Sequence, residues 1–578
     1  MTSSSQQPGM TPSKELVAAG KTVGWRWRQY LAAILVNIVS VALGTGYGWV
    51  APMLPLLQSE DSPIGIPPIS DDEASWIASI AMLSRLVSIP AYMYAHDRLG
   101  RKMTSYLTAI PYIASWTMFL CANSVTLLFC ARTPQDIILV LYALMICRVA
   151  AYITFKSPAD LKFVSCAHVE LLPACFHADV SNGLVPNTTE DRRHSSANHM
   201  AESTFLHEAQ FTKRFLLGVA SGGTCLLVPS YLSDIAEDDI KGQLGILYAM
   251  SIDVGLTLGY AMGHYMSYTA FNACCLLLPI FFAAAMFWLP ESPVFLMTEG
   301  KVEEARMALR WLRNGQETEA EMDRLRARAD DTLQKRYKKL TISDITERSM
   351  IRGILINLSL AVIRYLCGMN ALISYTVIIF QEAGSTIEPH ICTIATGLLF
   401  VFGSLFSSFV VERSGRRPLL IYSTILLAVS LITLGTYFYL KYLGWDLVYV
   451  GWIPLVCLCL YNMLHGIALG PLPSAIANET VTVHARGAVQ SLCNIAGSLV
   501  SFLVIMTYIP LSNTVGHHGC FWLYAGVCII GAIIMFLTVP ETKNRSMEDV
   551  VEQLKSDHYI KSVLQKKKDS DIVTKVIA

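Results

Sequence analysis

Two charged side chains lie in the middle of long apolar stretches of the sequence: Asp253 in the stretch 243–264 and Arg364 in the stretch 353–380. A charged group at the centre of a bilayer costs roughly 2.5–3.5 kcal/mol on insertion scales, so each should face a wet cavity or a partner. The two side chains could neutralise each other, or they could act directly on a substrate or on protons. The residues leave both interpretations open, and Arg85 poses the same question in an earlier apolar stretch.

The composition requires apolar surroundings for most of the chain. Of the 578 residues 53% are hydrophobic and only 15% are charged, which is more apolar surface than a soluble globule can bury. Lys plus Arg and Asp plus Glu number 44 each, so the overall charge gives no reason to expect nucleic acid as a partner. The 15 cysteines have neither the paired spacing of a disulfide framework nor that of a zinc site. We therefore expect a bilayer as solvent, no metal and no cofactor.

Apolar runs of about 20 residues predict twelve transmembrane helices, six on each side of a polar, basic segment. This pattern predicts an all-α membrane protein built from two pseudo-symmetric six-helix bundles. The candidate spans are 29–53, 74–95, 104–123, 215–233, 243–264 and 270–289, then 353–380, 391–411, 418–440, 447–477, 485–510 and 518–539. The predicted parts are an N-terminal tail (1–28), a first bundle (29–289), a linker with amphipathic helices (290–350), a second bundle (351–540) and a C-terminal tail (541–578).

Basic residues concentrate in alternate loops, which predicts the orientation of the spans. They cluster near residues 26–28, 98–102, 301–339, 413–417 and 543–545, whereas the loops after spans 1, 7 and 11 carry almost none. By the positive-inside rule, both termini and the central linker should be cytoplasmic.

A charged motif recurs after the second span of each half. The first half carries Asp97-Arg98-Leu99-Gly100-Arg101-Lys102 and the second carries Glu412-Arg413-Ser414-Gly415-Arg416-Arg417. An internal repeat explains this pair economically. Carboxylates and guanidiniums at cytoplasmic helix ends can form charge-assisted hydrogen bonds that release when the inner mouth opens. The alternative is that these charges only set the topology.

The paired motifs resemble those of the major facilitator superfamily, and other segments narrow the resemblance to its sugar porters. Residues 290–296 (PESPVFL) are similar to the family's motif after the sixth span, and residues 539–546 (VPETKNRS) to the motif after the twelfth. Residues 229–242 resemble the end of the fourth span, with Asp234 and Lys241 where Glu and Arg are usual. Residues 44–49 (GTGYGW) are similar to the insect facilitated trehalose transporter-like subgroup.

The resemblance covers about residues 25–550 and implies a carrier in the plasma membrane that works as a monomer on a small molecule, with a sugar expected. It also implies a set of latch residues at the cytoplasmic helix ends. These are Asp97, Arg98, Arg101, Asp234, Lys241, Glu291, Glu412, Arg413, Arg416, Glu479 and Arg486. In the tenth span, Gly470, Pro471 and Pro473 should break the helix and form a flexible gate.

The resemblance places the substrate in a central cavity, where amides and hydroxyls bind sugar hydroxyls and aromatic rings pack on the sugar ring. Sugar porters carry two glutamines, Ser-Gly-x-Asn and paired tyrosines in the seventh span. This chain keeps Asn370 and Tyr375 but has Arg364 and Tyr365 in place of the glutamines. Other expected ligands are replaced by Ala249, Phe400, Gly466 and Ser474. The candidate substrate-binding residues are therefore Asn370, Tyr375, Tyr365, Arg364 and Asp253.

Residues 133–214 interrupt the resemblance. Joining 124–132 to 215–228 restores a fourth span, so we interpret the block as a non-spanning insertion, either native or an aberrant splice product. A thirteenth span would place the basic linker outside, against the charge rule. Asn187 heads a glycosylation sequon that would be used only if the block is extracellular.

Three functions remain open at this stage. The leading hypothesis is a sugar or polyol carrier that works by alternating access. Asp253 and Arg364 favour an organic-ion or proton-coupled carrier instead. The lost sugar ligands and the split fourth span favour a transport-inactive sensor or an aberrant isoform. No nucleophile elbow or phosphate loop is present, so we do not expect an enzyme.

Overall fold

The computed structural model describes residues 12–60, 68–120, 193–237, 239–315, 319–337, 347–385, 387–482, 485–543 and 547–555. Within these ranges the regular structure is helical throughout. Ten of the described helices or helix pairs are long and apolar enough to cross a membrane.

The first half contains α1 (Pro12–Gly48), α2 (Val50–Leu57), α3 (Asp71–Leu120), α6 (Arg193–Ile235), α7 (Lys241–Tyr265) and α8 (Tyr268–Trp288). The linker contains α9 (Pro293–Thr298), α10 (Val302–Leu312) and α11 (Glu319–Tyr337). The second half contains α13 (Arg348–Leu366), α14 (Met369–Ala383), α15 (Pro389–Ser414), α16 (Arg416–Tyr442), η2 (Val448–Val450), α17 (Ile453–Leu464), η3 (His465–Leu469), α18 (Leu472–Thr480) and α19 (Arg486–Thr538), followed by α20 (Met547–Lys555).

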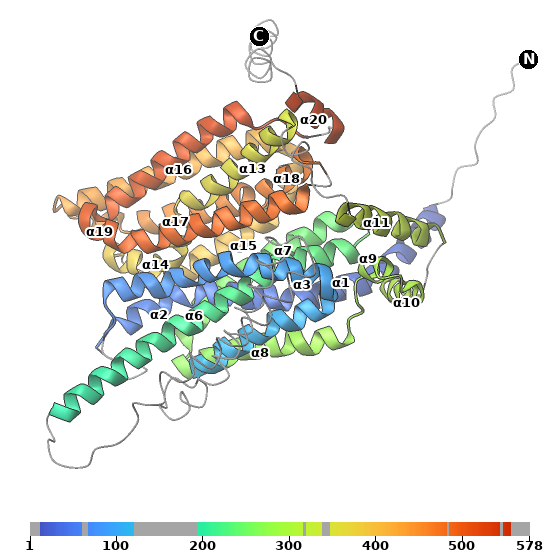
Figure 1. Ribbon diagram of the computed structural model, residues 1–578. Coiled ribbons are helices and arrows are strands. Elements are labelled where there is room, and N and C mark those ends of the chain that lie inside the picture. The colour runs from blue at the N-terminus through green and yellow to red at the C-terminus, as the bar shows by residue number, and fades with distance from the viewer. Residues whose placement is uncertain are drawn as a thin grey trace, which may run out of the picture.

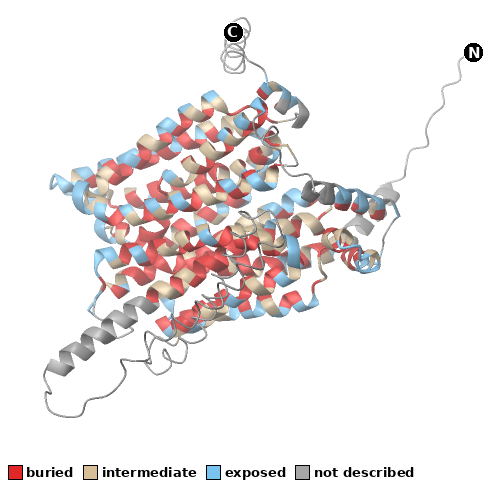
Figure 2. Cartoon of the chain, viewed as in Figure 1, coloured by how far each residue is buried: buried red, intermediate tan, exposed pale blue. Residues whose placement is uncertain are grey.

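The two halves form two helical bundles that lie against each other, with α3 packed on α19 and α7 packed on α15 (Figure 1). The linker helices α9, α10 and α11 and the C-terminal helix α20 gather at one end of the bundles. Buried side chains concentrate inside the bundles and where they meet, whereas exposed residues follow the outer helix faces (Figure 2). Large apolar residues are among those exposed, including Phe281, Phe287 and Trp288 on α8, as expected for a surface solvated by lipid.

Small residues allow the closest helix contacts in the first half. A Cβ atom added to Gly44 on α1 would lie 2.0 Å from the carbonyl oxygen of Ile252 on α7. One added to Gly255 would lie 2.2 Å from the carbonyl oxygen of Val41. Backbones approach this closely only where side chains are absent, as is typical of packed helices in membranes.

Two of the long helices change direction at a glycine. Gly100 inside α3 has φ +82 and ψ 178, and Gly516 inside α19 has φ +80 and ψ 161, which are not helical angles. Both φ values lie in a region that favours glycine. The spans predicted at 74–95 and 104–123 therefore both fall within α3, and those predicted at 485–510 and 518–539 both fall within α19.

The structure differs from the expected insertion at its C-terminal boundary. Helix α6 runs without a break from Arg193, and the part long and apolar enough to span begins at Gln210, inside the block expected to end at 214. Arg214 is 2% exposed, and its guanidinium donates hydrogen bonds to the carbonyl oxygens of Ile77 and Gly46 at 3.1 and 2.9 Å. These contacts let a charged residue continue the helix, so Phe215 is not its start. Residues 121–192, which include Asn187 and the expected first part of the fourth span, lie outside the described residues.

Candidate functional site

The turn at Gly100 creates a carboxylate site at the end of α3. The helical segment after the turn begins with two N–H groups that have no earlier helical carbonyl to bond. Glu291 accepts both, from the backbone of Arg101 at 3.0 Å and of Lys102 at 3.0 Å. A Cβ atom on Gly100 would lie 2.8 Å from Glu291 Oε2 and 2.6 Å from the Phe295 ring, so both the backbone angle and the space require glycine.

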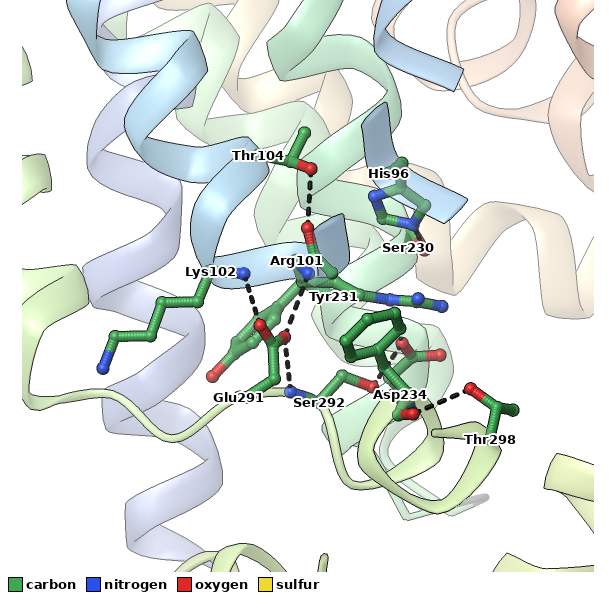
Figure 3. A network of polar contacts seen from close by, with 12 residues as sticks. His96, Arg101, Lys102, Thr104, Ser230, Tyr231, Asp234, Glu291, Ser292 and Thr298 are labelled. Carbon is green, nitrogen blue, oxygen red and sulfur yellow. Dashed lines mark hydrogen bonds and ion pairs between the residues drawn. The ribbon is translucent and has the colours of Figure 1, made fainter. Parts of the chain in front are cut away.

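The side chain of Arg101 completes this cluster. Its Nε atom lies 2.8 Å from Asp234 Oδ2 at the end of α6, and the Ser292 hydroxyl donates to the same oxygen at 2.7 Å. Figure 3 shows Arg101, Asp234, Glu291 and Ser292 converging from α3, α6 and the segment that leads into α9. The structure thus brings together three of the predicted latch residues, Arg101, Asp234 and Glu291.

The second half repeats the carboxylate part of this cluster, although Thr542, at the position of Ser292, has a buried hydroxyl without a hydrogen-bond partner among the described residues. Gly415 has φ +83, and Glu541 accepts the backbone N–H groups of Arg416 and Arg417 at 3.2 and 3.3 Å. The Arg416 guanidinium lies 3.4 Å from Glu479 Oε1. Glu541 therefore corresponds to Glu291, although it is not among the latch residues predicted from the sequence. Its place within VPETKNRS, matching the glutamate of PESPVFL, was the signal that could have identified it.

The remaining latch residues lie around these clusters. Asp97 and Lys241 are exposed, and the guanidinium of Arg98 lies 5.9 Å from the Tyr94 ring centre. The backbone oxygen of Arg413 accepts a hydrogen bond from Lys543 Nζ at 2.8 Å. Arg486 donates to the backbone oxygen of Asn478. The side chain of Glu412 lies outside the described residues.

A further charged cluster, not predicted from the sequence, ties the linker to the first half. Glu237, just after α6, accepts Arg26 at 2.9 Å and lies 3.3 Å from Arg313 at the end of α10. Arg313 is 5% exposed and also pairs with Glu321 on α11 at 2.5 Å. At the other end of the chain, Lys555 on α20 lies 2.8 Å from Glu347, whose carboxylate raises the pKa of the lysine.

Asp253 and Arg364 are not joined in an ion pair. The hydroxyl of Ser404 on α15 donates to the Asp253 carboxylate, so this buried acid on α7 bonds a neutral partner in the other half. Arg364 forms no ion pair within the described residues, and its Nε atom is buried without a hydrogen-bond partner. Its guanidinium carbon lies 5.3 Å from the Tyr365 ring centre.

Arg364 and Tyr365 line a cavity between α13, α18 and α19. The other polar residues around it are Asn357, Ser474, Gln490 and Asn494. Asn370 and Tyr375 do not line this cavity. Asn370 donates to the Ser501 hydroxyl at 2.7 Å, and Tyr375 donates to the Ile505 carbonyl at 3.2 Å and stacks on Tyr508.

Arg85 connects the two halves close to this cavity. Its guanidinium donates to the Ser498 hydroxyl on α19 at 2.8 Å and to the Tyr47 hydroxyl on α1 at 3.0 Å. Electrostatic interactions with both Arg85 and Arg364 act on Tyr365, which places that ring next to the two cations.

The tenth span is interrupted at the predicted gate. Residues His465–Leu469 form a π-helical turn, closed by the Gly470 N–H donating to the His465 carbonyl at 2.8 Å. Pro471 and Pro473 follow at the start of α18, where their missing N–H groups cost the helix least. π-Turns within helices are frequent at functional sites, and the gating role stays a prediction.

Comparison with known proteins assigns the family. The family described as "Sugar (and other) transporter" matches residues 195–554, which is more than half of the chain, so this protein belongs to that family. It is 27% identical over 529 residues to "Facilitated trehalose transporter Tret1" of Aedes aegypti, covering 91% of this chain and 55% of that protein. It is 26% identical to the protein of the same name from Culex quinquefasciatus, covering 91% of this chain and 86% of that one. The chain thus spans about half the length of the first of these relatives.

The fold is shared with solved structures of the xylose transporter XylE from E. coli. The inward open conformation superposes with a TM-score of 0.63 at 16% identity, covering 90% of this chain and 99% of that one. The proton:xylose symporter XylE bound to 6-bromo-6-deoxy-D-glucose gives 0.63 at 17% identity, covering 92% and 100%. The predicted all-α membrane fold and the resemblance to sugar porters are confirmed, and the chain belongs to a family of transporters rather than enzymes.

Proposed function

We propose that this protein moves a small hydroxylated molecule, a sugar or a sugar derivative, across a membrane by alternating access. The observation that carries the proposal is the repeat of one carboxylate cluster in both halves, around Glu291 and Glu541. Two equivalent bundles with matching charged helix ends are the parts that a rocking carrier needs. Membership of the sugar transporter family and the similarity to proteins named as trehalose and xylose transporters support the choice of cargo.

We also propose twelve crossings, with both termini and the linker on the cytoplasmic side of the plasma membrane. The turns at Gly100 and Gly516 each divide a long helix into two segments, so that α3 and α19 supply two crossings each. Together with the other spans this gives an even number of crossings. The basic residues at the α9–α11 end support its cytoplasmic placement. We propose a functional monomer, because substrate is expected between the halves of one chain.

Contacts between the halves support an inward-facing arrangement. At the end opposite the linker, Asn513 on α19 donates to Asp71 at the start of α3 at 3.0 Å. His264 at the end of α7 lies 3.7 Å from Glu388 before α15. At the linker end, the carboxylate clusters around Glu291 and Glu541 each join elements of a single half. Both clusters are formed in this arrangement, which does not fit the expectation that their hydrogen bonds release when the inner mouth opens. Closure at one end with separate clusters at the other is what one state of an alternating cycle requires.

Uptake by proteoliposomes tests the proposal. Purified full-length chain would be reconstituted and given labelled trehalose, glucose and xylose, with Arg310→Gln, an exposed position on α10, as a matched charge-removal control. We expect saturable uptake of at least one sugar, unchanged in the control. Protein that melts cooperatively but moves no sugar would overturn the sugar proposal and favour a transport-inactive role.

A further inference from the structure

The cavity beside Arg364 holds a positive charge, and no carboxylate is among the described residues that line it. Within the described residues Arg364 forms no ion pair, and the nearby guanidinium of Arg85 bonds the neutral hydroxyls of Ser498 and Tyr47. Asp253, the acid expected to compensate Arg364, interacts with it electrostatically but forms no ion pair with it; Asp253 is bonded by Ser404 and does not line the cavity. A guanidinium inside a membrane protein is costly unless water or an anion faces it.

The other polar groups around the cavity have unused hydrogen-bonding capacity. The side-chain amides of Gln490 and Asn494 line it and form no hydrogen bond with another described residue. The Oδ1 atom of Asn357 is buried and unpartnered, because its Nδ2 atom alone bonds Gly353 and Thr480. Amides of this kind can donate to and accept from hydroxyl groups.

The walls between these groups limit the size and shape of a ligand. Cys493, Ala361, Ala477 and Pro473 contribute apolar surface, and the Tyr365 ring packs so closely that a Cβ atom on Gly497 would lie 2.3 Å from it. A ligand here would have a hydroxylated face toward Gln490 and Asn494 and its charged group at Arg364.

We propose that this cavity binds a small organic anion that also carries several hydroxyl groups, such as a sugar acid. The Arg364 guanidinium would hold the carboxylate, and Gln490, Asn494 and Asn357 would bind the hydroxyls. A planar guanidinium forms two parallel hydrogen bonds with one carboxylate, and neither a neutral sugar nor a simple halide ion can form such a bidentate pair. Transport of such an anion rests on the proposed carrier function, whereas its binding in the cavity does not.

Ligand-dependent melting of the purified full-length protein tests the binding directly. The probes are D-gluconate, which has both the charge and the hydroxyls, D-glucose, which lacks the charge, and acetate, which lacks the hydroxyls. We expect gluconate to raise the melting temperature at concentrations where glucose and acetate do not. Glucose or acetate stabilising the protein as well as gluconate does would overturn the proposal.

Variants distinguish the contribution of the Arg364 charge from that of the other residues of the cavity. Arg364→Gln should weaken gluconate binding roughly tenfold or more, as expected for a lost hydrogen bond to a charged group. Arg364→Lys should retain part of the binding because it keeps the charge, and Arg310→Gln on α10 should change nothing. If Arg364→Gln fails to fold, Gln490→Ala with Asn494→Ala should reduce gluconate binding toward that of acetate. Unchanged gluconate binding in these variants contradicts the site.

Uptake experiments keep the two proposals distinguishable. Transport of neutral sugar without any binding of gluconate supports the proposed function and overturns this inference. Binding of gluconate that depends on Arg364, in a protein that transports nothing, supports this inference and overturns the carrier function. Accumulation of gluconate, with a gain of glucose uptake in Arg364→Gln, supports both, since sugar porters carry glutamine at that position.

Discussion

His264 Nδ1 on α7 lies 3.7 Å from Glu388 Oε1 before α15, and the His264 ring stacks on that of His390 at 5.2 Å. These three residues join the first half to the second at the end opposite the linker. Glu388 can compensate a proton on one imidazole, whereas two protonated, stacked rings would repel each other.

We therefore expect Glu388→Gln to make transport sensitive to acid. On acidification the variant should lose activity that the native chain keeps, because protonated imidazoles at this contact would lack their carboxylate partner. The measurement is initial uptake rate against external pH. Adding His264→Asn should make the profile flat again, and a Glu388→Gln profile identical to that of the native chain would refute the idea.

Equivalent losses should follow from damage to either carboxylate cluster. Arg101→Ala removes the ion pair with Asp234 at 2.8 Å, and Arg416→Ala removes the ion pair with Glu479 at 3.4 Å. We expect slower transport with normal membrane insertion in both variants. A hydrogen bond to a charged group contributes about 1.5–3 kcal/mol, so the shorter pair at Arg101 should matter more. Kinetics of uptake, with surface expression as the control, provide the comparison. If both variants transport at the native rate, these charges would serve only to set the membrane topology.

Glu541→Gln is the sharper test of the second cluster, because its carboxylate accepts two backbone N–H groups. We expect it to impair transport as Glu291→Gln does, since both glutamates cap a helical segment after a glycine turn. Uptake by Glu541→Gln at the native rate, alongside an impaired Glu291→Gln, would show that the two clusters are not equivalent.

The recurrence of the motif after the second span of each half predicted that Arg101 and Arg416 occupy equivalent positions, because a local repeat preserves spacing. A local repeat could not predict which distant residues contact the buried charges Arg85 and Asp253. Ser498 lies 413 positions from Arg85, and Ser404 lies 151 from Asp253, so these pairs follow from helix packing alone. Tyr375 was expected to face the substrate but stacks on Tyr508, since the sequence does not fix the rotation of a helix about its axis.

Asp253 should couple energetically to Ser404 more strongly than to Arg364. In a double-mutant cycle, Asp253→Asn with Ser404→Ala should deviate from additivity by about 0.5–3 kcal/mol in the free energy of unfolding, as contacting residues do. Asp253→Asn with Arg364→Gln should deviate less, because these two charges attract each other without forming an ion pair. Thermal or denaturant unfolding in detergent provides the values. The opposite pattern would restore the direct pairing expected from the sequence.

Deleting part of the 133–214 block should have an effect that depends on where the deletion ends. A chain that joins 132 to 193 keeps α6 whole, whereas one that joins 132 to 215 removes Arg214 and its bonds to Ile77 and Gly46. We expect the second chain to melt at a lower temperature. Equal melting temperatures would mean that residues 193–214 contribute nothing to the bundle.

The carboxylate clusters also bear on how the chain is made. Gly100, Arg101, Asp234 and Glu291 all precede α13, so the first bundle can complete its cluster before the ribosome has translated the second. Because domains generally fold as units during synthesis, the nascent first half would already have its helix ends fixed while the later spans are still being inserted. Two separately expressed fragments, divided within the linker, should then each reach the membrane with a finished inner end and assemble there into a working pair.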